Sequence, residues 1–312
     1  MSKIDFILNR RQKRMYIEGI KCGSFAWLLG RLKITQMIND EYKANLEFTP
    51  KNWWWSLKVW LAKILLKGNL KWLKHFIELP SVLFEYSYTT ELDGHKFLID
   101  NKDHRMSEIL NDYKVLDIWE PETTKLVKEH VIEGMTCVDI GASVGYFTLL
   151  FAKQVGETGK VVSIEPTEMG FSYQQENIKL NGYKNILPFK IAAWDKQEVI
   201  SIPKNSPYPI WSNASPVDDI LEGLGIMEVD FIKIDVDGPE PRVLKGLERT
   251  IQRSPNLKMV IEYLPKYIEM AGESPEEFLS FINKYFNFIV VPDDYVGDCQ
   301  NLFCVKKNEN NC

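Results

Sequence analysis

An α/β fold with a doubly wound, mostly parallel sheet is predicted by three features of the chain from residue 119 onward. Short apolar runs alternate with amphipathic segments, as in repeated βαβ units. Runs such as FIKIDV (231–236) are almost continuously apolar, which is typical of parallel strands covered on both faces. The last two runs are joined by a polar segment, residues 292–300, without a helix, so those strands must pair antiparallel. We therefore expect seven strands, with the last one antiparallel.

The individual elements follow from the apolar runs and from local start and stop signals. Asn181-Gly182 suits a left-handed helix end. Ser215 with Asp218 resembles a capping box, with Pro216 at the first helical position. We expect strands at 136–140, 160–165, 186–194, 229–236, 258–264, 286–291 and 302–306, and helices at 122–131, 146–155, 168–180, 215–224, 239–252 and 275–285.

Charge is distributed unevenly along the 312 residues, which carry 38 basic and 43 acidic side chains and a net charge of −5. Residues 1–80 hold 15 basic and 6 acidic side chains, whereas residues 81–312 hold 23 and 37. This asymmetry argues against a uniformly basic nucleic-acid-binding protein. We expect a basic, tryptophan-rich helical accessory region at 1–80. A β-hairpin with an Asp93-Gly94 turn and a short helix at 107–113 should occupy 81–118, and the α/β domain 119–312.

Residues 51–74 combine five tryptophans with lysines spaced along one helix face. One interpretation is a helix at a membrane surface that contacts anionic lipid. The other is a helix whose tryptophans pack on the main domain. The longest apolar stretch, 53–66, is shorter than the roughly 20 residues that span a bilayer. The charged start predicts no secretory signal, and five cysteines without paired spacing suit a reducing compartment. We expect a cytoplasmic protein, with peripheral membrane contact as an alternative.

Candidate ligand-binding residues follow the expected strands, because ligands of such sheets bind at the carboxyl ends of the strands. In Asp139-Ile-Gly-Ala-Ser-Val-Gly-Tyr-Phe147, small residues let a ligand approach the backbone, and the following helix attracts an anionic group. Glu165-Pro166 is placed to bind ribose hydroxyls. Trp194 can cover a purine, and Asp195 can accept a hydrogen bond from an exocyclic amine. The carboxylates after the next two strands are Asp235, Asp237, Glu240 and Glu262.

Three ligand classes compete for this arrangement. Dinucleotide binding requires G-x-G-x-x-G, but here Ser143 replaces the second glycine and the third is displaced. Gly141-Ala-Ser143-Val-Gly145 matches the nucleophile elbow of α/β-hydrolases, whose catalytic histidine follows the serine in the chain. All four histidines precede Ser143, which argues against a hydrolase. The third class is binding of S-adenosylmethionine (AdoMet).

Several segments resemble the FkbM family of class I methyltransferases. They are WEPETTKLV (119–127), VDIGASVGYFTLLFAK (138–153), VVSIEP (161–166), ENIKLNG (176–182), AAWDK (192–196), VDDIL (217–221) and FIKIDVDGPEPRVLKG (231–246). The resemblance covers roughly residues 115–265. It implies a Rossmann-like sheet, AdoMet as the cofactor and O-methylation of a hydroxyl on a sugar, a glycolipid or a related metabolite. The chain departs from the family pattern at Asp237, where the family has glutamate, and at Ser143, where it often has asparagine.

The expected site residues combine this resemblance with the positions at the strand ends. Asp235 is the first choice for a general base, because it ends a central strand. Asp195 as a turn residue and Asp235 as a helix cap are the structural alternatives. We expect the catalytic residues to be Asp235, Asp237 and Glu262, and the cofactor-binding residues to be Asp139, Gly141, Ala142, Ser143, Gly145, Tyr146, Phe147, Glu165, Pro166, Trp194, Asp195 and Asp235.

The expected partner is a small-molecule, glycan or glycolipid acceptor rather than a nucleic acid. Tyr208 or Trp211, in a proline-rich loop at 203–216, is a candidate to stack on a sugar ring. We expect no metal, because methyl transfer does not need one; the alternative is a divalent cation held by Asp235 and Glu262. Two other functions stay open. They are an RNA methyltransferase that uses the basic N-terminal region, and a non-catalytic AdoMet-binding or membrane-associated scaffold.

Overall fold

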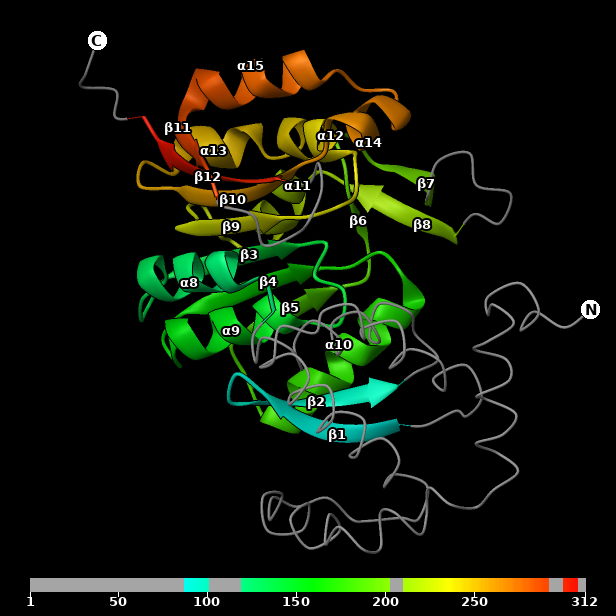
Figure 1. The fold of residues 1–312 in the computed structure, drawn as a ribbon, viewed down its shortest axis with the longest axis vertical. Helices are drawn as coiled ribbons and strands as arrows, with labels where there is room; N and C mark the ends of the chain where they lie inside the picture. Colours follow the sequence, from blue (N-terminus) through cyan, green and yellow to red (C-terminus); the bar gives the residue numbers. More distant parts are fainter. Residues whose placement is uncertain (1–86, 101–118, 203–209, 292–299, 308–312) are drawn as a thin grey trace, which may run out of the picture. The chain divides into compact units, whose positions relative to one another are not determined.

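The computed structural model describes residues 87–100, 119–202, 210–291 and 300–307 (Figure 1). The expectations for residues 1–80, for the membrane-contacting segment 51–74, for a short helix at 107–113 and for Tyr208 lie outside the described residues. Among the described helices, none has the length and apolar character needed to cross a membrane.

The central element is a seven-stranded sheet of the predicted kind, with the strand order β11-β12-β10-β9-β3-β4-β5. Strand β12 runs antiparallel to both of its neighbours, and the other pairings are parallel, which confirms the prediction for the final hairpin. The strands are β3 (Thr136–Ile140), β4 (Lys160–Ile164), β5 (Ile186–Phe189), β9 (Phe231–Ile234), β10 (Lys258–Tyr263), β11 (Phe286–Val290) and β12 (Gln300–Lys306).

Helices cover both faces of the sheet, as continuously apolar strands require (Figure 1). Alternate residues of one strand enter opposite clusters of buried side chains: Phe231 packs on the face of α8 and α9, and Ile232 on the face of α11 to α13. The helices are α8 (Pro121–His130), α9 (Tyr146–Val155), α10 (Glu168–Asn181), α11 (Val217–Gly223), α12 (Glu240–Lys245), α13 (Glu248–Arg253), α14 (Pro265–Met270) and α15 (Pro275–Tyr285).

The predicted hairpin is confirmed as β1 (Ser87–Leu92) and β2 (His95–Asp100), joined by Asp93-Gly94. Both turn residues have a positive φ, 49° and 77°, as a tight hairpin turn requires. Asn177 on α10 accepts a hydrogen bond from Leu98 N at 2.7 Å, which fixes the hairpin on that helix. The predicted left-handed helix end is also confirmed, at Gly182 with a φ of 72°.

Several sequence predictions between residues 186 and 252 were wrong in detail. The expected strand 186–194 divides into β5 and β6 (Ala192–Ala193). Strand β6 joins a second sheet with β7 (Glu198–Ile202) and β8 (Ile210–Ser215), so residues 210–215 form a strand rather than a loop. The expected helix 239–252 divides into α12 and α13 at Gly246, where a Cβ would lie 1.8 Å from the carbonyl oxygen of Trp194. Helix α14 was not predicted.

The predicted capping box at Ser215 was also wrong. Ser215 ends β8, and Pro216 occupies the position before α11 rather than its first turn. The Asp218 carboxylate instead accepts hydrogen bonds from the backbone of Arg249 and Thr250, at 3.0 and 2.8 Å, at the start of α13. A tertiary contact has therefore replaced the local cap.

Strands β3 and β9 bring the glycine loop against the residue that follows β9. Asp235 N donates to Ile140 O at 3.0 Å, so the pairing continues to the last residue of β3. Gly141 has a φ of 81°, and a Cβ there would lie 1.7 Å from the Asp235 carbonyl oxygen. Only glycine fits this position, because a side chain would separate the two segments.

We expect Gly141→Ala to destabilise the protein strongly. Alanine at position 141 would be strained by the positive φ and would also clash with the backbone of Asp235. Gly182→Ala is the control, because Gly182 has a similar φ but a Cβ there would meet no atom within 4 Å. The control should cost about 1–2 kcal/mol, and Gly141→Ala should cost at least about 2 kcal/mol more. Chemical denaturation of both variants measures the difference; equal losses would contradict the close contact with Asp235.

Candidate functional site

The loop after β3 adopts the backbone conformation that its small residues allow. Gly141, Ser143 and Gly145 all have a positive φ, of 81°, 48° and 92°. Gly141 N and Ala142 N donate to Ile164 O at 2.9 and 3.1 Å, which ties the loop to β4. The loop leads directly into α9, whose first N–H groups lack partners within the helix. It is therefore a site where an anionic or hydroxyl group can approach the backbone.

Glu165 fastens this loop to the next one. Its Oε2 accepts from Ser143 N at 2.8 Å, and its Oε1 accepts from Thr167 N at 2.9 Å and from the Thr167 hydroxyl at 2.5 Å. A Cβ on Gly170 would lie 2.9 Å from Glu165 Oε1, so α10 also packs closely on the carboxylate. Pro166 is half-buried beside it. The Glu165 carboxylate holds Ser143 in its left-handed conformation. A ligand hydroxyl that donates to Glu165 would use a lone pair that is not yet engaged, or it would replace one of the hydrogen bonds from Thr167.

Trp194 and Asp195 follow β6 and contact α12. Asp195 Oδ2 accepts from Arg242 Nη1 at 3.0 Å, and the Arg242 guanidinium lies 5.3 Å from the centre of the Trp194 ring. The Trp194 indole N–H donates to Glu198 at 2.7 Å. Asp195 Oδ1 is buried and has no hydrogen-bond partner among the described residues. Asp195 therefore holds an unused acceptor, which suits the predicted contact with an amine.

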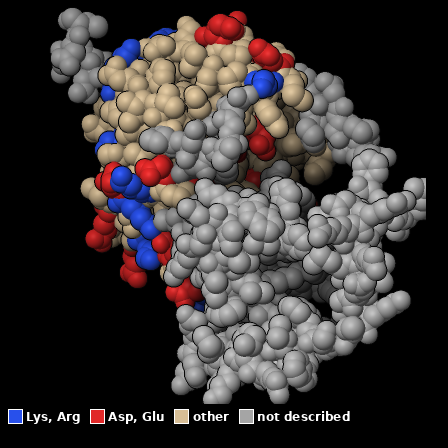
Figure 2. All heavy atoms as spheres, viewed as in Figure 1, with Lys and Arg blue, Asp and Glu red and all other residues tan. Residues whose placement is uncertain are grey.

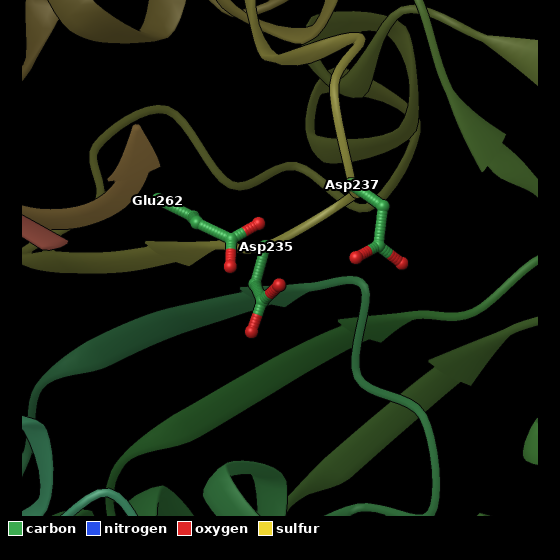
Figure 3. Close-up of side chains that lie close together, drawn as sticks. All are labelled: Asp235, Asp237 and Glu262. Carbon is green, nitrogen blue, oxygen red and sulfur yellow. The ribbon is translucent and has the colours of Figure 1, made fainter. Parts of the chain in front are cut away.

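The three predicted catalytic carboxylates lie together at the ends of β9 and β10 (Figure 3). One oxygen of each of Asp235, Asp237 and Glu262 lies within 4.8 Å of the others. The Asp235 side chain is 31% exposed, and Asp237 is exposed with a φ of 57°. Glu262 is buried. Such a group of oxygens suits a proton acceptor, and it also offers the ligand type that hard divalent cations prefer.

Lys233 is the site residue that the sequence analysis missed. It is 4% exposed and lies in the middle of β9. Its ammonium lies 2.6 Å from Asp235 Oδ2, 3.9 Å from Glu120 Oε1 and 4.5 Å from the centre of the Phe147 ring. Burial alone would lower the pKa of Lys233, but Asp235, Glu120 and Asp139 together raise it above its ordinary value. The lysine is therefore a cation, and it fixes one oxygen of Asp235.

Glu120 is the second residue that was missed. It precedes α8 with a φ of 42°, which is strained for a residue with a side chain. Its side chain makes no cap hydrogen bond to the helix and lies instead near Lys233. The signals in the sequence were a lysine inside an apolar strand and a glutamate before a Pro-initiated helix, but neither identifies its partner.

Asp139 belongs to the same buried polar layer. Its Oδ2 accepts from the Thr148 hydroxyl at 2.5 Å, and it pairs in register with Lys233 and with Ser163. Burial raises the pKa of Asp139 to about 6, against the lowering effects of Lys233 and Thr148. Asp139 thus contacts α9 from beneath the loop.

The side chains of Tyr146 and Phe147 are buried in the core. The Tyr146 hydroxyl lies 3.3 Å from Thr124 Oγ1, and the Phe147 ring lies under Lys233. The side chains of these two predicted cofactor-binding residues therefore belong to the core, and their backbone N–H groups lie in the first turn of α9.

Glu240 holds the loop that carries Asp235 and Asp237. Its Oε1 accepts from Val236 N at 3.2 Å and from Gly238 N at 3.1 Å. Glu240 is fully buried, and its Oε2 has no hydrogen-bond partner among the described residues. Burial raises the pKa of Glu240 to about 7, although its backbone hydrogen bonds lower it. In a large fraction of the folded molecules Glu240 is therefore protonated near neutral pH.

Comparison with known proteins shows similarity to methyltransferases. Residues 139–290 match the model of the methyltransferase FkbM domain. Protein-L-isoaspartate O-methyltransferase 1 of Arabidopsis thaliana is 24% identical over 120 residues, which cover 38% of this chain and 49% of that protein. The enzyme of the same name from Methanosarcina mazei is 25% identical over 114 residues, covering 34% and 47%. The chain thus spans about half the length of these curated relatives.

Solved structures that the chain matches include a methyltransferase and a fibrillarin. A SAM-dependent methyltransferase from Aquifex aeolicus is 25% identical, with a TM-score of 0.40, and the match covers 66% of this chain and 99% of that one. Fibrillarin of Aeropyrum pernix, solved with natively bound S-adenosyl-L-methionine, is 15% identical, with a TM-score of 0.42 and coverages of 70% and 82%.

We expect Glu240→Gln to remove a pH-dependent loss of stability. The folded protein holds the Glu240 proton up to a pKa of about 7, and the unfolded chain releases it near pH 4.3. The wild type should therefore lose up to about 3 kcal/mol of unfolding free energy relative to the variant as the pH rises from 4.5 to 7. Titration of Asp139 changes the unfolding free energy of both proteins equally, so it cancels in the difference between them.

Urea unfolding of wild type and variant across that pH range measures this difference. The exposed Glu176→Gln on α10 is the control and should follow the wild-type curve. Parallel curves for wild type and Glu240→Gln would contradict the raised pKa.

Proposed function

We propose that this chain, whose residues 139–290 match the model of the methyltransferase FkbM domain, transfers a methyl group from AdoMet to a hydroxyl oxygen. We further propose that the hydroxyl belongs to a sugar, a glycolipid or a related metabolite. The cofactor, the residue roles and the acceptor class below are parts of this one proposal.

The proposal rests chiefly on the contact between Gly141 and Asp235. Because no side chain separates them, the glycine loop and the three carboxylates form one continuous site at the ends of β3, β9 and β10. A loop that binds AdoMet next to a carboxylate that can accept a proton is the pairing that O-methyl transfer needs.

The residues present fit AdoMet at three places. Glu165 is a buried carboxylate beside the glycine loop and can accept hydrogen bonds from ribose hydroxyls. Asp195 Oδ1 is a buried acceptor that can take a hydrogen bond from the exocyclic amine of adenine. The N–H groups of the first turn of α9 suit the carboxylate of the methionine part. Glu165 follows β4 and α9 follows the loop after β3, whereas Asp195 follows β6 of the second sheet.

AdoMet, when bound, supplies a methyl group on a sulfonium: the acceptor oxygen bonds to the methyl carbon in line with the S–C bond, which breaks and leaves the sulfur as a neutral thioether. Asp235 takes the hydroxyl proton of the acceptor. Lys233 holds Asp235 Oδ2 at 2.6 Å, which orients the carboxylate for this transfer. Asp237 and Glu262 lie beside Asp235 and accept hydrogen bonds from the acceptor's neighbouring hydroxyls, so they orient it.

The β7–β8 hairpin is the surface that we assign to the acceptor. It projects on the side toward which β3, β4 and β5 point (Figure 1). Trp211 is 67% exposed and shares one face of the hairpin with Asn213, two residues further along β8. An aromatic face with a nearby amide suits a sugar ring.

The charges on the described part of one face suit an uncharged acceptor better than a polyanion. Lys, Arg, Asp and Glu side chains lie mixed on the described part of the face in Figure 2. Nucleic-acid binding relies instead on a concentrated basic surface.

Calorimetry with AdoMet and S-adenosylhomocysteine (AdoHcy) tests the cofactor assignment. We expect both to bind, and Glu165→Ala to weaken binding by about 100-fold, since two charge-assisted hydrogen bonds are lost. Glu168→Ala is the control, because Glu168 is an exposed carboxylate three residues away that pairs with Lys190. If the wild type binds neither ligand, the proposed function is wrong. If Glu165→Ala binds as the wild type does, the ribose assignment fails.

Asp235→Asn should lower the rate of methyl transfer by about 10²–10⁴-fold, the usual contribution of a general base. The affinity for AdoHcy should change little, because Asn has the same shape. Transfer of labelled methyl to an accepting extract fraction measures the rate, and calorimetry measures the affinity. Unchanged transfer would exclude Asp235 as the base. Glu228→Gln is the control, because Glu228 is exposed and precedes β9, at the opposite end of the strand from Asp235.

A further inference from the structure

Arg242 connects three separate segments around Asp195. Its Nη1 donates to Asp195 Oδ2 at 3.0 Å, and its Nε donates to Glu273 Oε1 at 2.6 Å. Its guanidinium also lies over the Trp194 ring, at 5.3 Å from the centre. One planar side chain on α12 therefore holds the residues after β6 and the segment between α14 and α15.

The backbone around Asp195 is fixed independently of Arg242. Trp194 N donates to Ser215 O at 3.0 Å, which joins Trp194 to the end of β8. The carbonyl oxygen of Trp194 lies 1.8 Å from where a Cβ of Gly246 would be, so the end of α12 packs directly on it. What remains variable is the orientation of the Asp195 carboxylate, and this is what Arg242 sets.

The contact with Arg242 leaves the other carboxylate oxygen of Asp195 without a partner among the described residues. With Oδ2 occupied by Arg242, Asp195 Oδ1 is buried and has no partner among the described residues. A buried acceptor that is left unpaired is costly, and such a group is typical of a place that a ligand donor fills. The Asp195 side chain as a whole is 22% exposed, so Oδ1 belongs to a side chain at the border of the protein interior.

We propose that Arg242 is a positioning residue that orients Asp195 Oδ1 toward the exocyclic amine of the adenine, and that it thereby sets the preference for an adenine nucleoside. The inference rests on the proposed function, because it assumes AdoMet as the ligand. Arg242 itself does not contact the ligand. The planar guanidinium is essential because it donates along two fixed directions to two carboxylates at once, which an ammonium cannot do.

The test compares the binding of two ligands by calorimetry: AdoHcy, and its analogue that carries purine in place of adenine and so lacks only the amine. We expect the wild type to prefer AdoHcy by roughly ten- to a hundredfold, as for a hydrogen bond to a charged group. Arg242→Lys keeps the charge, and Lys245, 3.7 Å from Glu273, still neutralises that carboxylate. In this variant the preference should fall below about threefold, while the affinity for the analogue stays within twofold of the wild type.

Two further variants separate positioning from general damage to the structure. Arg249→Lys makes the same exchange on α13, where Arg249 pairs with Asp219 and Glu222 on the surface, and it should keep the full preference. Asp195→Ala should lose the preference, and adding Arg242→Lys to it should cause no further loss.

The outcomes are distinguishable from those of the proposed function. If the wild type binds neither ligand, the proposed function fails and this inference falls with it. If the wild type binds both ligands equally, AdoMet binding stands and the inference is overturned. It is also overturned if Arg242→Lys keeps the preference, or if that variant weakens both ligands by the same factor.

Discussion

The buried ammonium of Lys233 is the interaction on which the arrangement of the site depends. It lies in the middle of the central strand β9 and is surrounded by the carboxylates of Asp235, Glu120 and Asp139. A charge in this position is tolerated only with its partners, and removing one partner of a buried ion pair typically costs about 3–5 kcal/mol. Glu120 and Asp235 both supply partners to the ammonium, which also orients the Asp235 carboxylate.

Polar side chains extend from this cation through the interior on one side of the sheet. The Thr148 hydroxyl donates to Asp139, Gln174 Nε2 donates to Thr148 at 3.4 Å, and the Ser163 hydroxyl donates to Gln174 at 3.2 Å. This chain joins β3, β4, α9 and α10 directly beneath the glycine loop. Because buried hydrogen-bonded networks specify one arrangement, the loop and the strand ends are held in a fixed geometry before any ligand arrives. Such preorganisation is what a positioning-dependent reaction requires.

Much of the fold could be predicted from the sequence, because the strands have strong apolar patterns and the motifs follow directly after them. The order of strands and helices, the Asp93-Gly94 hairpin and the proximity of Asp235 to Glu262 are features of this kind. The features that were missed depend on contacts between distant segments. Lys233 was hidden in an apolar run, and the break at Gly246 arises because α12 packs on the Trp194 backbone. Local sequence patterns cannot reveal the role of Lys233 or the helix break at Gly246, because both depend on contacts with residues elsewhere in the chain.

The central claim is that the site uses AdoMet to methylate a hydroxyl oxygen of a glycan, a glycolipid or a related metabolite rather than of a protein or an RNA. The most direct measurement incubates the full chain and AdoMet labelled in its methyl group with fractionated glycan, lipid, protein and RNA extracts, and then treats the labelled product with mild alkali. The account predicts label in a glycan or lipid fraction as an alkali-stable methyl ether. Label that is released by alkali from protein, as expected of a methyl ester, or label that is confined to RNA, would contradict it.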